Sequence, residues 1–290
     1  MTSVLAVIGG SGLYDVDALD SPEEIRITTP YGDPSDVIVR GQFKGTDTLG
    51  LFLPRHGRSH RFSPSNINYR ANLCALKMLG ATHVLSVSAV GSMKEEIAPG
   101  DLVVVDQFID LTKQRKSTFF DEGIVGHVSF AEPVCSIMAG AVYEAAKTTE
   151  ARAVHRGGTY VCIEGPQFST RAESLVYRSW GVSVIGMTNM PEAKLAREAE
   201  LPFATLALST DYDCWHDTHA DVSVEAVLAV LKQNVRFAKQ VARTLAGALP
   251  DVSQSIAKNA LKNAVMTAPG AIEPETEKRL YWLLGTRAGS

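Results

Sequence analysis

Residues 202–215 carry two carboxylates, Asp211 and Asp213, directly after Phe203–Leu208, an apolar run that predicts a buried strand. If the backbone stays extended, side chains two residues apart point to the same side, so both carboxylates face one surface. Two carboxylates on one face repel, and one of them then tends to keep its proton near neutral pH. A protonated carboxyl group serves as a general acid or as a hydrogen-bond donor to a ring nitrogen. The alternative is a helix cap followed by solvated acids, ahead of a helix at 222–248.

A second group of chemically active side chains lies in PRHGRSH at 54–60, which follows another predicted strand. The guanidinium fork of arginine suits phosphate oxygens and histidine can donate beside it, so Arg55 and His56 are candidate phosphate ligands. His56 and His60 have the spacing of a helical metal pair, but Gly57 and the missing glutamate argue against one, and we expect no metal site. The alternative is a solvated basic loop.

Four further predicted strands end in short segments with polar or small residues. These are Gly9–Gly12 after Val4–Ile8, Ser88–Ser92 after His83–Ala89, Glu164–Glu173 after Thr159–Ile163, and Met187–Glu192 after Val182–Met187. The glycine-rich segment offers backbone N–H groups and the hydroxyl of Ser11 to an anion, although neither well-known phosphate fingerprint is complete and a plain tight turn is the alternative. Because ligands of open α/β sheets bind at strand ends, these segments together predict one shared pocket.

The bulk composition excludes several classes of protein. The chain has 290 residues, of which 45% are hydrophobic and 21% charged, with a formal net charge of -4. These values are typical of a globular protein and give no indication of a nucleic-acid or membrane surface. No segment has the length of a membrane span and the N-terminal apolar run is too short for a signal peptide, so we expect a cytoplasmic protein. The four cysteines are far apart and predict buried free thiols.

Strands alternate with amphipathic helices along residues 1–250. This alternation predicts an α/β fold with a mostly parallel, twisted central sheet flanked by helices in a single domain. Leu102–Ile109 is predicted as one of the buried strands. The loop at 111–127 that follows is long enough to be functional or interfacial, and its basic residues, Lys113, Arg115 and Lys116, are typical of a solvated face.

The last part of the chain has a different pattern. Pro250 ends the long helix, and shorter helical patterns occupy 252–266 and 273–285. We therefore predict that residues 251–290 form a C-terminal helical extension packed on the same domain.

Together these segments resemble the purine nucleoside phosphorylase family, and within it the branch that acts on 5′-methylthioadenosine. The matching segments keep the family's order and lie within residues 4–248. They are IGGSGLYD at 8–15, PRHGRSH at 54–60, INYRANLCALK at 67–77, SAVGSMKEEIAPGDLVVVDQFID at 88–110, EGPQFSTRAES at 164–174, MTNMPEAKLA at 187–196 and STDYDCW at 209–215. The resemblance implies an enzyme that adds inorganic phosphate across the glycosidic bond of a purine nucleoside, with phosphate as co-substrate and no cofactor.

The resemblance also implies a role for each matching residue. The phosphate would be held by Ser11, Arg55, His56, Ser88, Ala89 and Thr188, with Arg55 acting as a fork and Ala89 through its N–H. Met187 would lie against the ribose, and Phe168 and Ser169 would line the base. Close relatives often have threonine at positions 11 and 88, and the serines here keep the hydroxyl group.

The two carboxylates acquire separate roles by the same resemblance. Asp211 matches the residue that supplies a proton or a strong hydrogen bond to N7 of the leaving purine, and Asp213 matches the residue beside the 6-position. Branches that cleave 6-oxopurines carry an asparagine at the first position and a glutamate matching Ser169, so Asp211 with Ser169 points to a 6-aminopurine. The alternatives are a phosphorylase for methylthioinosine or inosine and, more remotely, a non-catalytic nucleotide-binding module built on Gly9–Gly12.

The 5′ side of the pocket involves a neighbouring subunit in the family. His127, in the context HVSFAEP, matches a histidine that reaches into the neighbour's site. The resemblance therefore implies a homotrimer with shared active sites, and small-molecule partners only.

Overall fold

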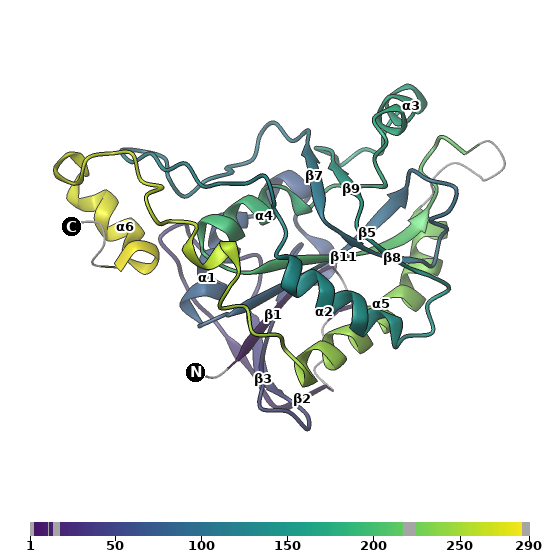
Figure 1. Cartoon of the computed structure of the whole chain (residues 1–290), viewed down its shortest axis with the longest axis horizontal. Helices are drawn as coiled ribbons and strands as arrows, with labels where there is room; N and C mark the ends of the chain where they lie inside the picture. Colours follow the sequence, from purple (N-terminus) through teal and green to yellow (C-terminus); the bar gives the residue numbers. More distant parts are fainter. Residues whose placement is uncertain (1–2, 11, 14–17, 217–223, 286–290) are drawn as a thin grey trace.

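The computed structural model describes residues 3–10, 12–13, 18–216 and 224–285. In this part of the chain one eleven-stranded sheet forms the centre of the molecule, and the chain also forms six α-helices (Figure 1). The strands are β1 (Val4–Gly9), β2 (Leu19–Ile25), β3 (Ile38–Phe43), β4 (Leu49–Pro54), β5 (His83–Ser92), β6 (Leu102–Val105), β7 (Gln107–Asp110), β8 (Val154–Arg156), β9 (Thr159–Cys162), β10 (Val184–Gly186) and β11 (Phe203–Asp211). The helices are α1 (Tyr69–Met78), α2 (Ser136–Lys147), α3 (Arg171–Ser179), α4 (Asn189–Glu198), α5 (Val224–Gly247) and α6 (Pro274–Leu284).

The centre of the sheet is parallel and its margins are mixed. Strands β4, β1, β5 and β11 pair in parallel in that order, and β10, β9 and β7 form a second parallel group. Antiparallel pairs join β2 to β3, β3 to β4, β6 to β11 and β10 to β5. The predicted α/β fold with a mostly parallel sheet is therefore confirmed, and the antiparallel strands lie where the sheet ends or branches.

The sheet divides at β5. Leu5–Ile8 of β1 pair with the first residues of β5, His83–Ser86, whereas β10 pairs with Gly91 and Ser92 at the other end of β5. On its opposite side β5 is accompanied by β11 from Val84 onward. In the described strands, neither β1 nor β10 pairs with the residues between Ser86 and Gly91. A space at the carboxyl end of β1 results, at the kind of position where α/β sheets bind ligands.

Alternate residues of the central strands enter two different hydrophobic cores, because helices cover both faces of the sheet. In β1, Ala6 and Ile8 belong to the core that includes residues of α1 and α4, whereas Leu5 and Val7 belong to the core beneath α2 and α5. Helices α2 and α5 contact each other across their face of the sheet (Figure 1). The two cores hold the strands rigidly, and with them the strand ends that form the site.

Two predicted elements are wrong. The predicted strand Leu102–Ile109 is two strands, β6 and β7, separated at Asp106, whose carboxylate accepts a hydrogen bond from the N–H of Gly158. The predicted helix at 252–266 contains only a short 3₁₀ segment, Ile256–Asn259. Backbone groups that a helix would use are bonded elsewhere there: Leu261 N–H donates to Glu200, for example.

Two strands were not predicted. Strand β2 (LDSPEEI) is rich in exposed polar residues and lies at the edge of the sheet, and β8 has three residues. Neither has the apolar run that marks a buried strand, so the sequence pattern contains little signal for either. None of the described helices is long and apolar enough to cross a membrane.

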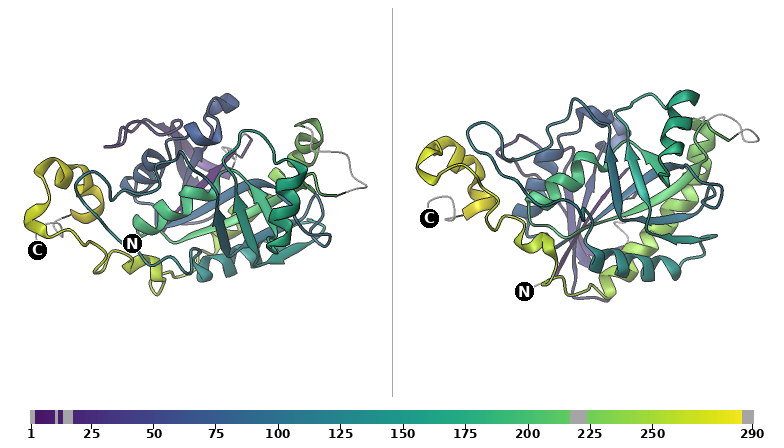
Figure 2. Two further views of the ribbon diagram at one scale, coloured as in Figure 1. Left: turned by 90° about the horizontal axis from the view of Figure 1, so that it is seen from above. Right: turned by 45° about the horizontal axis from the view of Figure 1, so that its top comes forward.

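The described part of the C-terminal extension packs mainly against the loop that follows β7. Gly126 forms a β-bridge with Val265, and α6 is attached through an ion pair between Arg279 and Asp121 with 3.0 Å between Nη1 and Oδ1. The ring of Trp282 packs edge-on against Phe119, with ring centroids 5.0 Å apart. Figures 1 and 2 show α6 at one end of the molecule, beyond the sheet. A division of the chain at residue 250 stays a prediction.

Candidate active site

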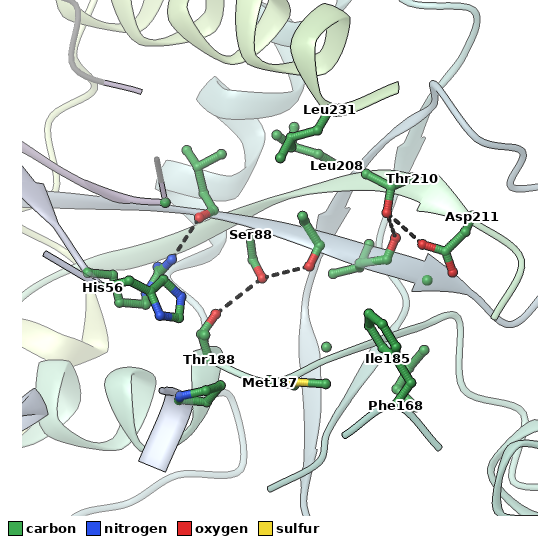
Figure 3. A pocket seen from close by; sticks show the side chains of 18 of the residues that line it. His56, Ser88, Phe168, Ile185, Met187, Thr188, Leu208, Thr210, Asp211 and Leu231 are labelled. Carbon is green, nitrogen blue, oxygen red and sulfur yellow. Dashed lines mark hydrogen bonds between the residues drawn. The ribbon is translucent and has the colours of Figure 1, made fainter. Parts of the chain in front are cut away.

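A cavity of about 490 Å³ lies where the sheet divides at β5 (Figure 3). Its walls are the residues that follow β1, β4, β9 and β10, the middle of β5, the end of β11, and the first half of α5. The strand ends that the sequence predicts to form one pocket thus meet in this cavity.

Ten of the predicted site residues line this cavity. They are Arg55, His56, Ser88, Ala89, Phe168, Ser169, Met187, Thr188, Asp211 and Asp213. Ser11 lies outside the described residues. His127 does not line the cavity of its own chain; its N–H donates to the carbonyl of Ala264 on the C-terminal extension, 2.8 Å away. The roles of these residues stay predictions, whereas their grouping is a fact of the fold.

Hydroxyl and imidazole groups line one end of the cavity. Ser88 Oγ lies 3.3 Å from Thr188 Oγ1, and His56 lies beside them (Figure 3). His56 Nδ1 is 2.9 Å from the carbonyl oxygen of Phe62, and since a carbonyl only accepts, Nδ1 carries the hydrogen. Burial lowers the pKa of His56 to about 4, so the ring is neutral at pH 7 and Nε2 keeps a lone pair. This end combines hydroxyl donors with one acceptor, and carries no charge from His56.

Arg55 differs from the expectation in its geometry. Its guanidinium fork is directed at a buried carboxylate, with Nε 2.8 Å from Glu192 Oε1 and Nη2 2.9 Å from Glu192 Oε2. The remaining donors reach Ser86 Oγ at 2.7 Å and the carbonyl of Val87 at 3.0 Å. Nε and Nη2 are thus occupied by Glu192 and Ser86, whereas Nη1 has a second hydrogen besides the one directed at Val87, so the phosphate-binding role of Arg55 stays a prediction. Arg55 also fixes β5 immediately before Ser88.

At the opposite end of the cavity, Asp211 and Asp213 are not on continuous extended backbone. Strand β11 ends at Asp211, and Asp213 has a φ of 52°, in the left-handed region. The turn brings the N–H of Asp213 to 2.8 Å from Asp211 Oδ1, and the hydroxyl of Ser174 donates to Asp213 Oδ2. Both carboxylates therefore face the cavity, but through a turn rather than through strand alternation.

The pKa values of both carboxyl groups are raised above their usual range. Burial is the main cause for Asp211, and the charge of Asp213 adds to it as a smaller effect. The hydrogen bonds that Asp211 accepts from Thr210 and from the Asp213 N–H oppose the shift in its pKa. Burial is also the main cause for Asp213, opposed by the Ser174 hydroxyl. The expected proton near neutral pH is favoured by a dry environment more than by repulsion.

Apolar side chains line much of the cavity. Leu231 lies on one side and Met187 on the opposite side (Figure 3), and Leu13 and Val235 are also among the lining residues. Phe168 is 50% exposed, so it is a wall of the pocket rather than a core aromatic. Leu231 and Val235 follow the apolar stripe of α5, and nothing in that stripe distinguishes them from core residues. A structure was needed to assign them to the site.

Among the basic residues after β7, Arg115 differs from the prediction. Arg115 is not part of a solvated face: its side chain is 1% exposed. Nη1 donates to the carbonyls of Met187 and Met190, each 2.6 Å away, and Nη2 donates to the carbonyl of Glu164 at 2.7 Å. Arg115 thus ties the loop at 111–127 to the segments that follow β9 and β10, which form the floor of the cavity.

The same loop is attached to α4 through Glu198, and this contact predicts a pH dependence of stability. Glu198 accepts hydrogen bonds from Thr118 Oγ1 and Phe119 N, each 2.7 Å away. Burial raises the pKa of Glu198 to about 7 from 4.5. The folded chain therefore binds this proton more tightly than the unfolded chain, so this contribution is complete below pH 4.5 and disappears as pH rises through 7. The difference between the limits is roughly 3 kcal/mol.

Glu198→Gln keeps the shape of the side chain and cannot ionise. We expect the variant to unfold at higher urea concentration than the wild type at pH 8, and at about the same concentration near pH 5. Glu150→Gln, at an exposed position after α2, is the control and should track the wild type at both pH values. If the wild type and Glu198→Gln show the same pH profile, Glu198 does not titrate between the two states.

Comparison with known proteins places the chain in a family. Residues 4–246 match the Phosphorylase superfamily. The S-methyl-5'-thioadenosine phosphorylase of Geobacter sulfurreducens is 52% identical over 287 residues, covering 99% of each chain. The protein of the same name from Thermosynechococcus vestitus is 51% identical over 98% of this chain and 99% of its own.

Solved structures agree with the sequence relatives. A methylthioadenosine phosphorylase from an antarctic soil metagenomic library has a TM-score of 0.90 and 49% identity, covering 98% of this chain and 100% of its own. The methylthioadenosine phosphorylase of Schistosoma mansoni, in complex with adenine, has a TM-score of 0.85 and 36% identity, covering 91% of this chain and 99% of its own. With similarity over nearly its whole length, in sequence and in fold, this chain belongs to the Phosphorylase superfamily.

Proposed function

We propose that this protein catalyses the phosphorolysis of 5′-methylthioadenosine, giving adenine and 5-methylthioribose 1-phosphate. One observation carries the proposal: a single cavity has hydroxyl donors at one end and two carboxyl groups of raised pKa at the other, with apolar side chains between them. The names of the relatives support the same reaction. Phosphate is the co-substrate, and the scheme needs no other cofactor.

At the hydroxyl end the phosphate would be held by neutral donors. Ser88 and Thr188 donate through their hydroxyl hydrogens, and Ala89 lies at the unpaired edge of β5, where its backbone approaches the cavity. The neutral Nε2 of His56 can accept the P–OH hydrogen of monohydrogen phosphate. The anion then keeps its negative charge, which is what stabilises the oxocarbenium-like ribose as the C1′–N9 bond lengthens.

At the carboxyl end Asp211 would hand its proton to N7 of the leaving purine. The hydroxyl of Thr210 lies 2.7 Å from Asp211 Oδ2 and 3.2 Å from the carbonyl of Val90. A proton on Oδ2 can therefore be donated to Thr210 Oγ1, whose own hydrogen then points to Val90. The hydrogen bond to Thr210 thus keeps the proton on Asp211 until N7 of the purine accepts it. General acid catalysis of this kind contributes roughly 10²- to 10⁴-fold to the rate.

Base preference follows from what faces the 6-position. Asp213, fixed by the Ser174 hydroxyl, presents carboxylate oxygens that accept from a 6-amino group. The hydroxyl of Ser169 is buried, lines the cavity and has no hydrogen-bond partner among the described residues. We infer that this hydroxyl forms a hydrogen bond with the bound purine base. The 5′-methylthio group would lie against the apolar side formed by Leu231 and Val235.

The proposal is tested by base release from four nucleosides with saturating phosphate: 5′-methylthioadenosine, adenosine, methylthioinosine and inosine. We expect the highest kcat/KM for 5′-methylthioadenosine. A preference for methylthioinosine would keep the phosphate site and the apolar 5′ pocket but overturn the assignment of Asp213 and Ser169. Absence of base release from all four would overturn the function.

We further propose a homotrimer in which His127 of one subunit completes the neighbour's site. The residue lies outside its own chain's cavity, on the loop held by the C-terminal extension, and the α5 side chains that line the cavity, Leu231 and Val235, are apolar. The free cysteines accord with a cytoplasmic location, which we propose as well.

Mixed subunits test the shared site. Light scattering should give three times 31.2 kDa. Trimers assembled from Asp211→Asn and His127→Ala subunits should be more active than either parent, because some of their sites carry both native residues. If mixing gives only the average of the parents, each site is built from one chain.

A further inference from the structure

We infer that Tyr160 is a positioning residue that aligns the two hydroxyl groups of the phosphate end, Ser88 and Thr188. This inference rests on the proposed function, because it assigns a role within the phosphorolysis site. The sequence offers no direct signal for it: Tyr160 lies within the predicted strand Thr159–Ile163 and has the pattern of a core residue.

The phenol of Tyr160 does not line the cavity but contacts two residues that do. Tyr160 is 0% exposed and its ring packs against Phe108, with 5.7 Å between the ring centroids. Its Oη lies 3.1 Å from Ser88 Oγ and 3.4 Å from the backbone N of Thr188. One hydroxyl group thus contacts both β5 and the segment after β10.

The donors and acceptors available on each group set the direction of each hydrogen bond. A phosphate dianion has mainly acceptor atoms, so Ser88 and Thr188 must both point their hydroxyl hydrogens at it. The oxygen of Ser88 is then free to accept, and Tyr160 is the adjacent donor. The N–H of Thr188 in turn donates to Tyr160 Oη. Burial raises the pKa of Tyr160 above its usual value, so the phenol keeps its hydrogen at any pH at which the enzyme would work.

The backbone opposite the phenol leaves room for it. A Cβ placed on Gly186 would lie 2.0 Å from Tyr160 Oη, a contact that no side chain permits. Gly186 immediately precedes Met187 and Thr188. The absence of a side chain there lets the phenol approach the strand end closely enough to bond Thr188, and a merely space-filling ring would not need its hydroxyl at this point.

The inference predicts an effect confined to one substrate. Tyr160→Phe keeps the ring and deletes the hydroxyl, so Ser88 and the Thr188 N–H each lose a partner. The KM for phosphate should rise roughly three- to tenfold, the loss expected for a hydrogen bond of ordinary strength. The KM for 5′-methylthioadenosine should stay within a factor of two, since the base and ribose contacts do not involve Tyr160.

A double-mutant cycle with Ser88→Ala separates positioning from structure. If Tyr160 acts through Ser88, adding Tyr160→Phe to Ser88→Ala should change the KM for phosphate by less than a factor of two. Tyr143→Phe, on the surface helix α2, is the matched control and should leave both KM values unchanged. Thermal unfolding of each variant shows whether the fold is intact.

The outcomes are distinguishable from failure of the proposed function. If the wild type releases no base with phosphate, the function fails and the inference falls with it. If the wild type is active and Tyr160→Phe leaves the KM for phosphate unchanged, or raises both KM values equally, the positioning role is wrong. A full effect of Tyr160→Phe in the Ser88→Ala background would likewise overturn the route through Ser88.

Discussion

Replacing Asp211 by asparagine should lower kcat for adenine release roughly 10²- to 10⁴-fold, the contribution of a positioned general acid. Asparagine keeps the size of the side chain and offers an N–H, but it has no proton to transfer to N7. The KM for 5′-methylthioadenosine should change little, because the apolar contacts remain. The ratio of activity on methylthioinosine to activity on 5′-methylthioadenosine should rise. Steady-state kinetics on both nucleosides measures each quantity.

The pH dependence of kcat tests the role of Asp211 independently. Burial raises the pKa of Asp211, and the acid is active only when protonated. The wild-type kcat should therefore fall on the alkaline side of the raised pKa, and this limb should be absent in Asp211→Asn. Asp251→Asn, on the exposed turn that follows α5, is the control. Full adenine-releasing activity in Asp211→Asn would show that Asp211 donates no proton.

Removing the buried carboxylate of Glu192 should have the largest effect on stability. Glu192 and Arg55 are 0% and 1% exposed and form a two-point ion pair. Glu192→Ala leaves a guanidinium charge buried without its partner. Breaking a buried ion pair in this way typically costs about 3–5 kcal/mol, and we expect the free energy of unfolding to fall by roughly that amount. Chemical denaturation measures it. A loss below about 1 kcal/mol would mean that water or another group compensates the charge.

A double replacement serves as the control for charge. In Arg55→Met with Glu192→Leu both ionic groups are gone, and apolar side chains of similar volume often restore much of such a loss. We expect the double variant to be more stable than Glu192→Ala. It should still bind phosphate poorly, because Arg55 holds the Val87 carbonyl next to Ser88. If the double variant is as unstable as Glu192→Ala, the lost packing rather than the unpaired charge explains the effect.

The positions of the site residues could be predicted better than their contacts. Polar residues at or near the ends of predicted strands, such as Ser88 and Thr188, are recognisable from local sequence, and an open α/β sheet gathers such residues at one edge. What Arg55 contacts depends on Glu192, which lies 137 residues away along the chain. No local pattern distinguishes an arginine that binds an anion from one that pairs with a distant carboxylate. The place of Arg55 in the pocket could therefore be predicted, whereas its pairing with Glu192 could not.

Burial explains the other differences between the predicted and the observed surroundings of residues. Arg115 and its basic neighbours look alike in sequence, but only the structure reveals three backbone carbonyls converging on one guanidinium. Tyr160 has the signature of a core residue and is one, yet its hydroxyl touches the site. The apolar stripe of α5 contributes both to the core and to the lining of the pocket. The hydrophobic periodicity of a sequence does not indicate that a residue belongs to both the core and the site, because it shows only which face of an element is buried.

The central claim is that one cavity brings phosphate and a purine nucleoside together for direct transfer. Incubation with 5′-methylthioadenosine and ³²P-labelled inorganic phosphate tests it, with adenine and labelled sugar phosphate counted in the same samples. The account predicts one labelled sugar phosphate for each adenine released, and no adenine without phosphate. Adenine release that continues without phosphate, or that leaves the sugar unlabelled, would show hydrolysis instead and contradict the account.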